Sequence, residues 1–464
     1  MATLDIWCHI HSLMPMGDAA RVACVSQAFA RFWRCHPNLV FTYETLGLKG
    51  NLCYEDDKMR HFTSKVDHIL KKHSGIGVKT FKLAVGLVYN DKDYCHLNHF
   101  DSWLRIAVKP GIEELTLSLS SLNARYNFPC SLLSSGTRDS LRYLSLVGCN
   151  FHPTVKCGSL RSLTRQHLCV VHIKDQELAC FLANSFSLER LEIRYCSAIL
   201  CLKIPFLQRL SFLKVILCDR LQAIQSKTSN LSNFDFAGDL RVQLSLGDTR
   251  QIRKLSRTCN DAAFYARTEL PSSMPNLVIL TICSYTEMVN TPMVTSKFLH
   301  LKFLNIILGG PAYDFVSLVS FFSCFSFLRK FHLEYKSLVL PSRMERVLIF
   351  ADPSTLRMIP HHHHDKLKRV DIINFSSAKS LVELTCHIVE STMSLERLTL
   401  DTTQGLPRCL LNKHAECFPM DRDVVSEGQR ALLAAPTYIK PKVQSTVEFN
   451  ILEPCSRCHG AELM

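Results

Sequence analysis

The sequence predicts an α/β solenoid, a stack of short repeats in which each repeat adds one strand to a parallel sheet. The first observation is the phrase Leu188-Glu-Arg-Leu191-Glu-Ile193-Arg-Tyr-Cys196. Its apolar residues at the first, fourth, sixth and ninth places describe a short strand with one buried face, followed by a turn that a small residue closes. The second observation is that this phrase recurs along most of the chain. The third is the length of 464 residues, which exceeds one ordinary core and favours repeats or several domains.

The recurring copies define the expected register of the repeats. They begin at Val78, Ile112, Leu141, Leu160, Leu188, Leu210, Leu231, Leu277, Leu301, Leu328, Leu367 and Leu395. Steps such as those from 188 to 210 and from 277 to 301 match the roughly 20–29 residues of a leucine-rich repeat. We therefore expect a horseshoe of leucine-rich repeats with a parallel sheet on its concave face.

Two places in this series are irregular. The copy at Leu160 is poor, because Arg165 stands where an apolar residue belongs. The gap between Leu231 and Leu277 is too wide for one repeat. We expect one degenerate copy in that gap, with Leu244-Ser-Leu246 as its strand.

Composition and cysteine usage bear on the class of protein and its compartment. Hydrophobic residues make up 47% of the chain and charged residues 20%, which is typical of a folded protein. No apolar run is long enough to cross a membrane, and the N-terminus lacks the pattern of a signal peptide. Many of the 21 cysteines close repeats, as Cys149, Cys196 and Cys218 do. We expect a soluble chain with reduced, buried thiols, located in the cytoplasm or the nucleus.

Charge and motifs narrow the function class. The net charge of +13 would permit contact with nucleic acid, but the basic residues are scattered, which argues against a nucleic-acid partner. The sequence lacks a phosphate-binding glycine loop, a Gly-x-Ser-x-Gly nucleophile motif, a His-Glu-x-x-His zinc motif and a dinucleotide-binding glycine pattern. We expect neither an enzyme nor a bound cofactor.

The N-terminal segment differs from the repeats. Ile6, Ile10 and Leu13 lie on one face of a short helix that ends before Pro15, and two more short helices are expected from Asp18 onward. Three such helices cannot bury all of their apolar surface among themselves. The remaining apolar face is either a docking surface for a partner or a cap on the first repeat, and the pattern alone favours neither.

A resemblance favours the docking surface. The segment resembles an F-box, the adaptor-binding motif of SCF-type ubiquitin ligases, in Leu4-Asp-Ile6-Trp7, Ile10, Leu13-Met-Pro15, Asp18, Val25-Ser26, Phe29 and Trp33. The chain is similar over nearly its full length to plant proteins that join an F-box to leucine-rich repeats and a C-terminal FBD segment. It lacks the Leu-Pro that commonly opens an F-box.

The resemblance implies a domain order, partners and a function. The implied order is an F-box at 1–45, a linker and leading helix at 46–77, a leucine-rich-repeat solenoid at 78–340, an FBD-like C-terminal repeat region at 341–404 and a partly ordered tail at 405–464. The F-box residues implied to bind a Skp-type adaptor, and through it a cullin, are Leu4, Ile6, Ile10, Leu13, Pro15, Val25, Phe29 and Trp33. The chain would then be the substrate-recognition subunit of an SCF-type E3 ubiquitin ligase. The alternative is a leucine-rich-repeat interaction scaffold with no role in ubiquitin transfer.

Residues between the inward leucines of each strand are candidates for binding a target. They alternate with buried residues, so they face the concave side of the sheet. The candidates are Glu192, Lys214, Asp235, Thr281, Asn305 and His332. Their mixture of charged and small polar groups favours an unknown protein target over a phosphate backbone. The alternative for each one is an ordinary solvated strand position.

Two motifs offer metal ligands. Adjacent loop residues point in divergent directions, so His361-His-His-His364 is expected to be a solvated loop. Cys455-Ser-Arg-Cys458-His459 has the spacing of half a zinc site and of a haem attachment motif. Because no second cysteine pair with zinc spacing accompanies it, we expect incidental thiols in a tail and no metal site.

Overall fold

The computed structural model describes most of the chain. The described residues are 2–48, 55–74, 76–85, 97–119, 126–133, 136–137, 139–154, 158–287, 297–309, 313–322, 325, 327–336, 356–357, 359, 363–405, 417 and 419–463. The chain divides into two compact units. Unit 1 comprises residues 1–231 and 241–248, and unit 2 comprises residues 232–240 and 249–464.

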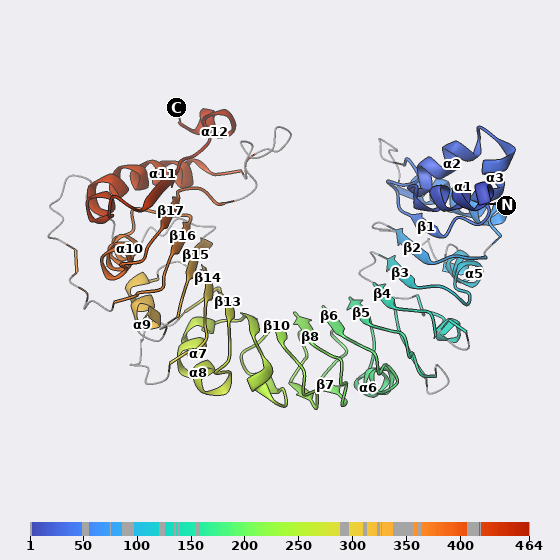
Figure 1. Ribbon diagram of the computed structural model, residues 1–464, viewed down its shortest axis with the longest axis horizontal. Helices are drawn as coiled ribbons and strands as arrows, with labels where there is room; N and C mark the ends of the chain where they lie inside the picture. The colour runs from blue at the N-terminus through green and yellow to red at the C-terminus, as the bar shows by residue number, and fades with distance from the viewer. Residues whose placement is uncertain are drawn as a thin grey trace. The chain divides into compact units, whose positions relative to one another are not determined.

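Unit 1 contributes parallel strands in chain order (Figure 1). They are β1 (Asn38–Phe41), β2 (Thr80–Val85), β3 (Glu114–Leu119), β4 (Tyr143–Val147), β5 (Arg165–Cys169), β6 (Arg190–Arg194) and β8 (Phe212–Ile216). Its helices are α1 (Ala2–Leu13), α2 (Met16–Ala23), α3 (Gln27–Trp33), α4 (Glu55–Lys72), α5 (Leu97–Ala107), the 3-10 turn η2 (Cys130–Leu133) and α6 (Asp175–Ala183). A second, three-stranded sheet joins β7 (Cys201–Ile204), β9 (Ala223–Ser226) and β11 (Gln243–Ser245).

Unit 2 repeats the pattern. Its parallel strands are β10 (Asn233–Ala237), β12 (Lys254–Thr258), β13 (Ile279–Ser284), β14 (Phe303–Gly309), β15 (Lys330–Lys336), β16 (Arg369–Ile373), β17 (Arg397–Asp401) and β18 (Glu448–Leu452). Its helices are η4 (Thr249–Gln251), α7 (Ala262–Thr268), α8 (Leu270–Ser273), η5 (Phe315–Leu318), α9 (Val319–Phe322), α10 (Lys379–Ser391), α11 (Arg422–Ala434), the π-turn η7 (Ala435–Ile439), η8 (Lys440–Lys442) and α12 (Ser456–Leu463). The main sheet has 15 strands, and the predicted α/β fold with a parallel sheet is confirmed.

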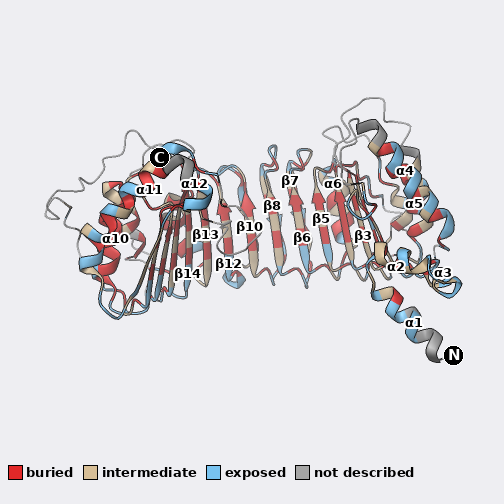
Figure 2. Ribbon diagram, turned by 90° about the horizontal axis from the view of Figure 1, so that it is seen from above, coloured by how far each residue is buried: buried red, intermediate tan, exposed pale blue. Residues whose placement is uncertain are grey.

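Alternation along each strand gives the sheet one buried face. In β6 the side chains of Leu191 and Ile193 are fully buried, whereas Glu192 between them lies on the opposite face. Leu188 and Cys196, the first and ninth residues of the phrase, are also buried. Figure 2 shows the same alternation of buried and less buried residues along the other strands. We call the less buried side of the strands the open face.

The turns after four successive strands of unit 1, β4, β5, β6 and β8, each begin with a residue in the left-handed conformation. In unit 1 the backbone has a positive φ at Gly148, Val170, Tyr195 and Leu217, each the first residue after its strand. Glycine is required at the first of these, because a Cβ on Gly148 would lie 1.7 Å from the Leu119 carbonyl oxygen. The next residue is in several repeats a buried cysteine, as predicted: Cys149, Cys196 and Cys218.

The predicted register at Leu160 is wrong. Strand β5 pairs Gln166 with Leu191 and Leu168 with Ile193, so the repeat begins at Leu163. Arg165 is therefore on the open face and exposed. Because Leu160 and Leu163 are both buried, the sequence offered two starts three residues apart. The polar Gln166 at the fourth place made the correct one harder to recognise.

The degenerate copy also lies elsewhere than predicted. It is β12, in which Leu255 pairs with Leu280 and the first place is Ile252. Leu244 belongs to β11 of the small sheet. The copy looked degenerate because Arg257 occupies an inward apolar place, where its guanidinium lies 4.3 Å from the centre of the Tyr265 ring.

Helices expected between strands are present. The predicted helix between the two FBD-like strands is α10, and its Leu381, Leu384 and Ile388 are fully or almost fully buried. Strands at both ends of the array were not predicted. β1 lies in the segment expected to be helical, and β18, in the segment expected to be a tail, pairs in parallel with β17.

Candidate functional site

The N-terminal helices use one face to cover the first strand. Met16 and Ala19 of α2 are buried. The Asn38 side-chain amide donates a hydrogen bond to the Ser12 carbonyl at 3.1 Å, and the Val40 N–H donates to the Met16 sulfur at 3.4 Å. These contacts fix α1 and α2 at the start of the sheet in unit 1.

Several apolar side chains of α1, and that of Val25 in the turn after α2, are exposed. The exposed fractions are 57% for Ile6, 51% for Trp7, 43% for Ile10, 71% for Leu13 and 82% for Val25. We call these five residues the N-terminal apolar face, and much of α1 is coloured as exposed in Figure 2. Single exposed apolar side chains are common, but four on one short helix, with a fifth in the turn after the next, mark an interaction surface.

The implied adaptor-binding residues fall into different environments. Ile6, Ile10, Leu13, Pro15 and Val25 are exposed. Phe29 is half-buried, with its ring centre 5.8 Å from that of Trp7, and Trp33 is buried and stacks on His36. The side chain of Leu4 lies outside the described residues. Trp7, which is exposed beside Ile6, was missed as a site residue although it stands inside the recognised phrase.

Three histidines lie close together: His11 of α1, His36 and His73. The rings of His11 and His36 have centres 5.5 Å apart, and His73 Nε2 lies 3.0 Å from the His36 carbonyl oxygen. Neither ring nitrogen of His36 has a hydrogen-bond partner among the described residues. Burial, followed by repulsion from His11 and His73, lowers the pKa of His36 to about 4. Burial also lowers the pKa of His11 and of His73.

On the open face of unit 1, Glu192 is held between two arginines. Its carboxylate accepts hydrogen bonds from Arg190 Nε at 2.7 Å and from Arg194 Nη2 at 2.9 Å. Burial alone would raise the pKa of Glu192, but the bonds from Arg194 and Arg190 bring it below its ordinary value. The Arg190 guanidinium also lies 3.6 Å from the centre of the Phe212 ring. Because two arginines surround one glutamate and the Phe212 ring lies beside them, this part of the open face is basic and aromatic.

On the open face of unit 2, a polar row crosses neighbouring strands. The cross-strand neighbours are, in order, Asp235, Ser256, Thr281, Asn305, His332, Asp371, Thr399 and Asn450. Burial lowers the pKa of His332, although Asp371 and Glu334 act in the opposite direction. Lys330 Nζ lies 2.9 Å from a carboxylate oxygen of Asp371.

The candidate target-binding residues are all half-buried on the open face, as the alternation predicts. Glu192 and Lys214 are cross-strand neighbours in unit 1. Thr281, Asn305 and His332 are consecutive neighbours in unit 2. Asp235 is separated from them by one strand. The intervening Ser256, and His167 beside Glu192, were missed because both belong to the repeats whose register was assigned incorrectly.

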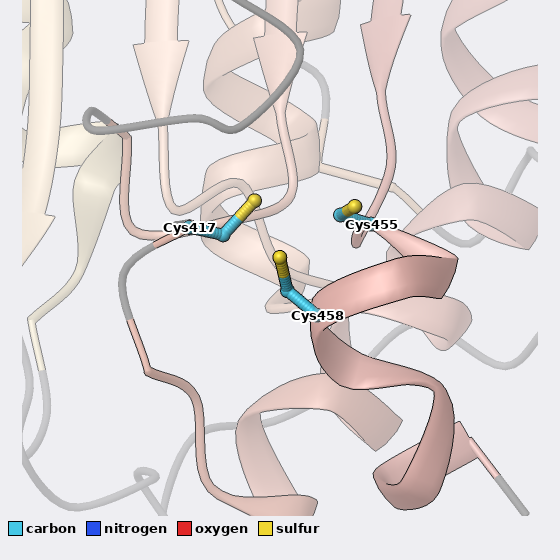
Figure 3. A group of neighbouring side chains, drawn as sticks. All are labelled: Cys417, Cys455 and Cys458. Atoms are coloured by element: carbon cyan, nitrogen blue, oxygen red, sulfur yellow. The ribbon is translucent and has the colours of Figure 1, made fainter. Parts of the chain in front are cut away.

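The two suspected metal motifs have different environments. His361 and His362 lie outside the described residues, and His364 is buried against the Phe322 ring rather than solvated. The thiols of Cys455 and Cys458 meet a third thiol, that of Cys417, with all three sulfur atoms within 4.8 Å of one another (Figure 3). The sequence did not reveal this group, because Cys417 is remote along the chain.

The stacked parallel strands and their open face agree with a comparison to protein families. Residues 69–456 match the family described as At1g61320/AtMIF1, LRR domain, a family of plant leucine-rich-repeat proteins. The chain belongs to this family. The At1g61320/AtMIF1 LRR domain covers most of both units, and it supports a repeat scaffold for protein interaction. Its match begins after the N-terminal helices.

The search of curated proteins gave no match to this member of the At1g61320/AtMIF1 LRR family. In the described part of the chain, no helix has both the length and the apolar character needed to span a membrane.

Proposed function

We propose that this chain is the substrate-recognition subunit of an SCF-type E3 ubiquitin ligase. The observation that carries the proposal is the N-terminal apolar face, whose Leu13 and Val25 are the most exposed large apolar side chains in the described part of the chain. A surface of this kind suits an amphipathic helix of a partner. The F-box resemblance of the same segment makes a Skp-type adaptor the partner that we propose, with a cullin bound through it.

The repeats would hold the protein to be modified. Their open faces carry basic, aromatic and small polar groups, among them Arg190, Phe212 and the row from Thr281 to His332. Aromatic and arginine side chains supply much of the binding energy in protein interfaces. We propose a protein target, in the cytoplasm or the nucleus, and no membrane or nucleic-acid partner.

The contribution of the chain would be proximity. Holding adaptor and target on one polypeptide makes ubiquitin transfer effectively intramolecular, with a local concentration on the order of mM for a well-matched span. In this proposal the chain forms and breaks no bond itself and uses no cofactor.

Capture of a Skp-type adaptor by the purified full-length chain tests the proposal. We expect capture by the native chain and a loss of at least about tenfold in affinity in Leu13→Asp or Val25→Asp, because a charge would be buried against an apolar partner. Phe206→Asp is the matched control. Phe206 is a large apolar residue that is likewise exposed, at 62%, but it does not belong to the N-terminal apolar face. No capture by the native chain, or an equal loss in the control, would contradict the proposal.

The second candidate is a repeat scaffold without a ubiquitin-ligase role, in which the N-terminal helices only cap the array. The buried Met16 and Ala19 and the hydrogen bond from Asn38 favour a capping role. Under this alternative the exposed Leu13 and Val25 have no partner. Proximity labelling in cells would then recover open-face partners but neither an adaptor nor a cullin.

A further inference from the structure

Three cysteine thiols converge at the C-terminal end of unit 2. Cys417 precedes α11, Cys455 follows β18, and Cys458 lies in the first turn of α12 (Figure 3). Their sulfur atoms all lie within 4.8 Å of one another. Cys417 and Cys455 are half-buried, and Cys458 is exposed, so the group can be reached from solvent.

Local structure explains why two of the thiols share a direction. Cys455 and Cys458 are three residues apart at the start of a helix, so their side chains project from one side of the first turn. The turn is anchored by the His459 N–H, which donates to the Cys455 carbonyl oxygen at 2.9 Å. Pairing of β18 with β17 fixes the chain just before Cys455.

The third thiol is brought to the pair by tertiary structure. Thr402, directly after β17, donates its N–H to the Leu452 carbonyl oxygen at 2.9 Å. Helix α11, which follows Cys417, contacts α12, which carries Cys458. Cys417 thus comes from the segment before α11, and Cys455 and Cys458 come from the start of α12, the helix that α11 contacts.

We propose that Cys417, Cys455 and Cys458 bind one zinc ion as three thiolates, with water or an added ligand in the fourth position. Zinc prefers sulfur ligands at about 2.3 Å in tetrahedral geometry, which places sulfur atoms roughly 3.8 Å apart. Separations of up to 4.8 Å reach this value by small side-chain rotations. Binding converts three thiols into thiolates and releases three protons to the buffer, so no oxidant or reductant is needed.

The zinc ion would act as a cross-link at the end of the sheet. β18 is the last strand in the sheet order, and an unprotected edge strand invites pairing with other chains. An ion bound by Cys417 and by the Cys455–Cys458 pair would link the segment before α11 to the start of α12. It would thereby restrain α12, which follows the edge strand β18 in the chain. In this proposal the ion cross-links two parts of unit 2, and its binding does not depend on the proposed adaptor binding.

The test uses the purified full-length chain, reduced and stripped of metal, and titrated with Co²⁺ and then with Zn²⁺. We expect one cobalt ion per chain with thiolate-to-cobalt absorption of a tetrahedral site, its displacement by zinc, and a rise in the unfolding temperature. Cys417→Ser, Cys455→Ser and Cys458→Ser should each weaken binding by more than the roughly 10–100-fold that a second-shell change costs.

Matched controls separate this site from the other cysteines. Cys24→Ser, exposed like Cys458, and Cys201→Ser, half-buried like Cys417, should leave cobalt absorption and affinity unchanged. Far-UV circular dichroism confirms that each variant is folded. Absence of thiolate-to-cobalt absorption in the native chain would overturn the proposal. An unchanged affinity in Cys417→Ser, or a Cys455–Cys458 disulfide in the chain as isolated, would overturn it as well.

Discussion

At the scale of single residues, Gln166 is the clearest departure from the repeat pattern. It stands between Leu144 and Leu191 on neighbouring strands and is buried. Neither Nε2 nor Oε1 of its amide has a hydrogen-bond partner in the described part of the chain. A buried polar group without a partner costs about 1–3 kcal/mol.

Gln166→Leu should therefore stabilise unit 1. We expect the free energy of unfolding to rise by about 1–2 kcal/mol, because leucine has a similar volume and needs no partner. Urea denaturation of the full chain measures the change. Gln208→Leu is the control, since Gln208 is exposed and should leave the midpoint unchanged. A lower midpoint for Gln166→Leu would mean that the amide is satisfied in solution.

Leu191 tests the packing of the repeated phrase. Its side chain is fully buried in β6 and has inward neighbours on β5 and β8. Leu191→Ala should lower the free energy of unfolding by roughly 2–5 kcal/mol, the cost of deleting a core leucine. The same denaturation experiment measures it, with Lys203→Ala as an exposed control. An unchanged midpoint would contradict the burial of this position.

At the scale of elements, the group formed by His11 of α1, His36 and His73 predicts sensitivity to acid. His36 occupies the first place of a repeat, three residues before the buried Leu39. Its folded-state pKa of about 4 lies below the ordinary value of about 6.5, so the unfolded state binds the proton first. Stability from this residue is complete above about pH 6.5 and is lost as the pH falls towards 4, by an amount on the order of 2 kcal/mol.

His36→Leu isolates this contribution. An apolar residue at the first place matches the other repeats, so His36→Leu should lose less stability than the native chain between pH 6.5 and 4. Denaturation midpoints across this interval measure the difference. His9→Leu, an exposed position on α1, serves as the control. Parallel pH profiles for the native chain and His36→Leu would rule out His36 as the acid-sensitive group.

The elements differ in how far the sequence predicted them. Repeats with leucine, isoleucine or phenylalanine at the inward places, such as those at Leu188 and Leu301, were assigned in the correct register. The assignments failed where a polar residue took an inward place, as Gln166 and Arg257 do. Burial of such a residue depends on its neighbours across the sheet, for example the Tyr265 ring against Arg257, and no local pattern reports that contact.

At the scale of the whole molecule, the sequence predicted the parallel sheet but not all the groups that it brings together. Thr281, Asn305 and His332 could be predicted as a row, because the period fixes which residues align. The convergence of Cys417 with Cys455 and Cys458 could not, because it depends on the packing of α11 against α12. The exposure of Leu13 and the burial of Trp33, which stacks on His36, likewise depend on how the N-terminal helices pack.

We propose that the N-terminal helices close the sheet with one face and bind an adaptor with the other. The most direct measurement takes the affinity for a Skp-type adaptor and the unfolding midpoint together, for the native chain and for Leu13→Asp. We predict a loss of at least about tenfold in affinity with an unchanged midpoint, because Leu13 is 71% exposed. A lowered midpoint, or an unchanged affinity, would contradict this division of the two faces.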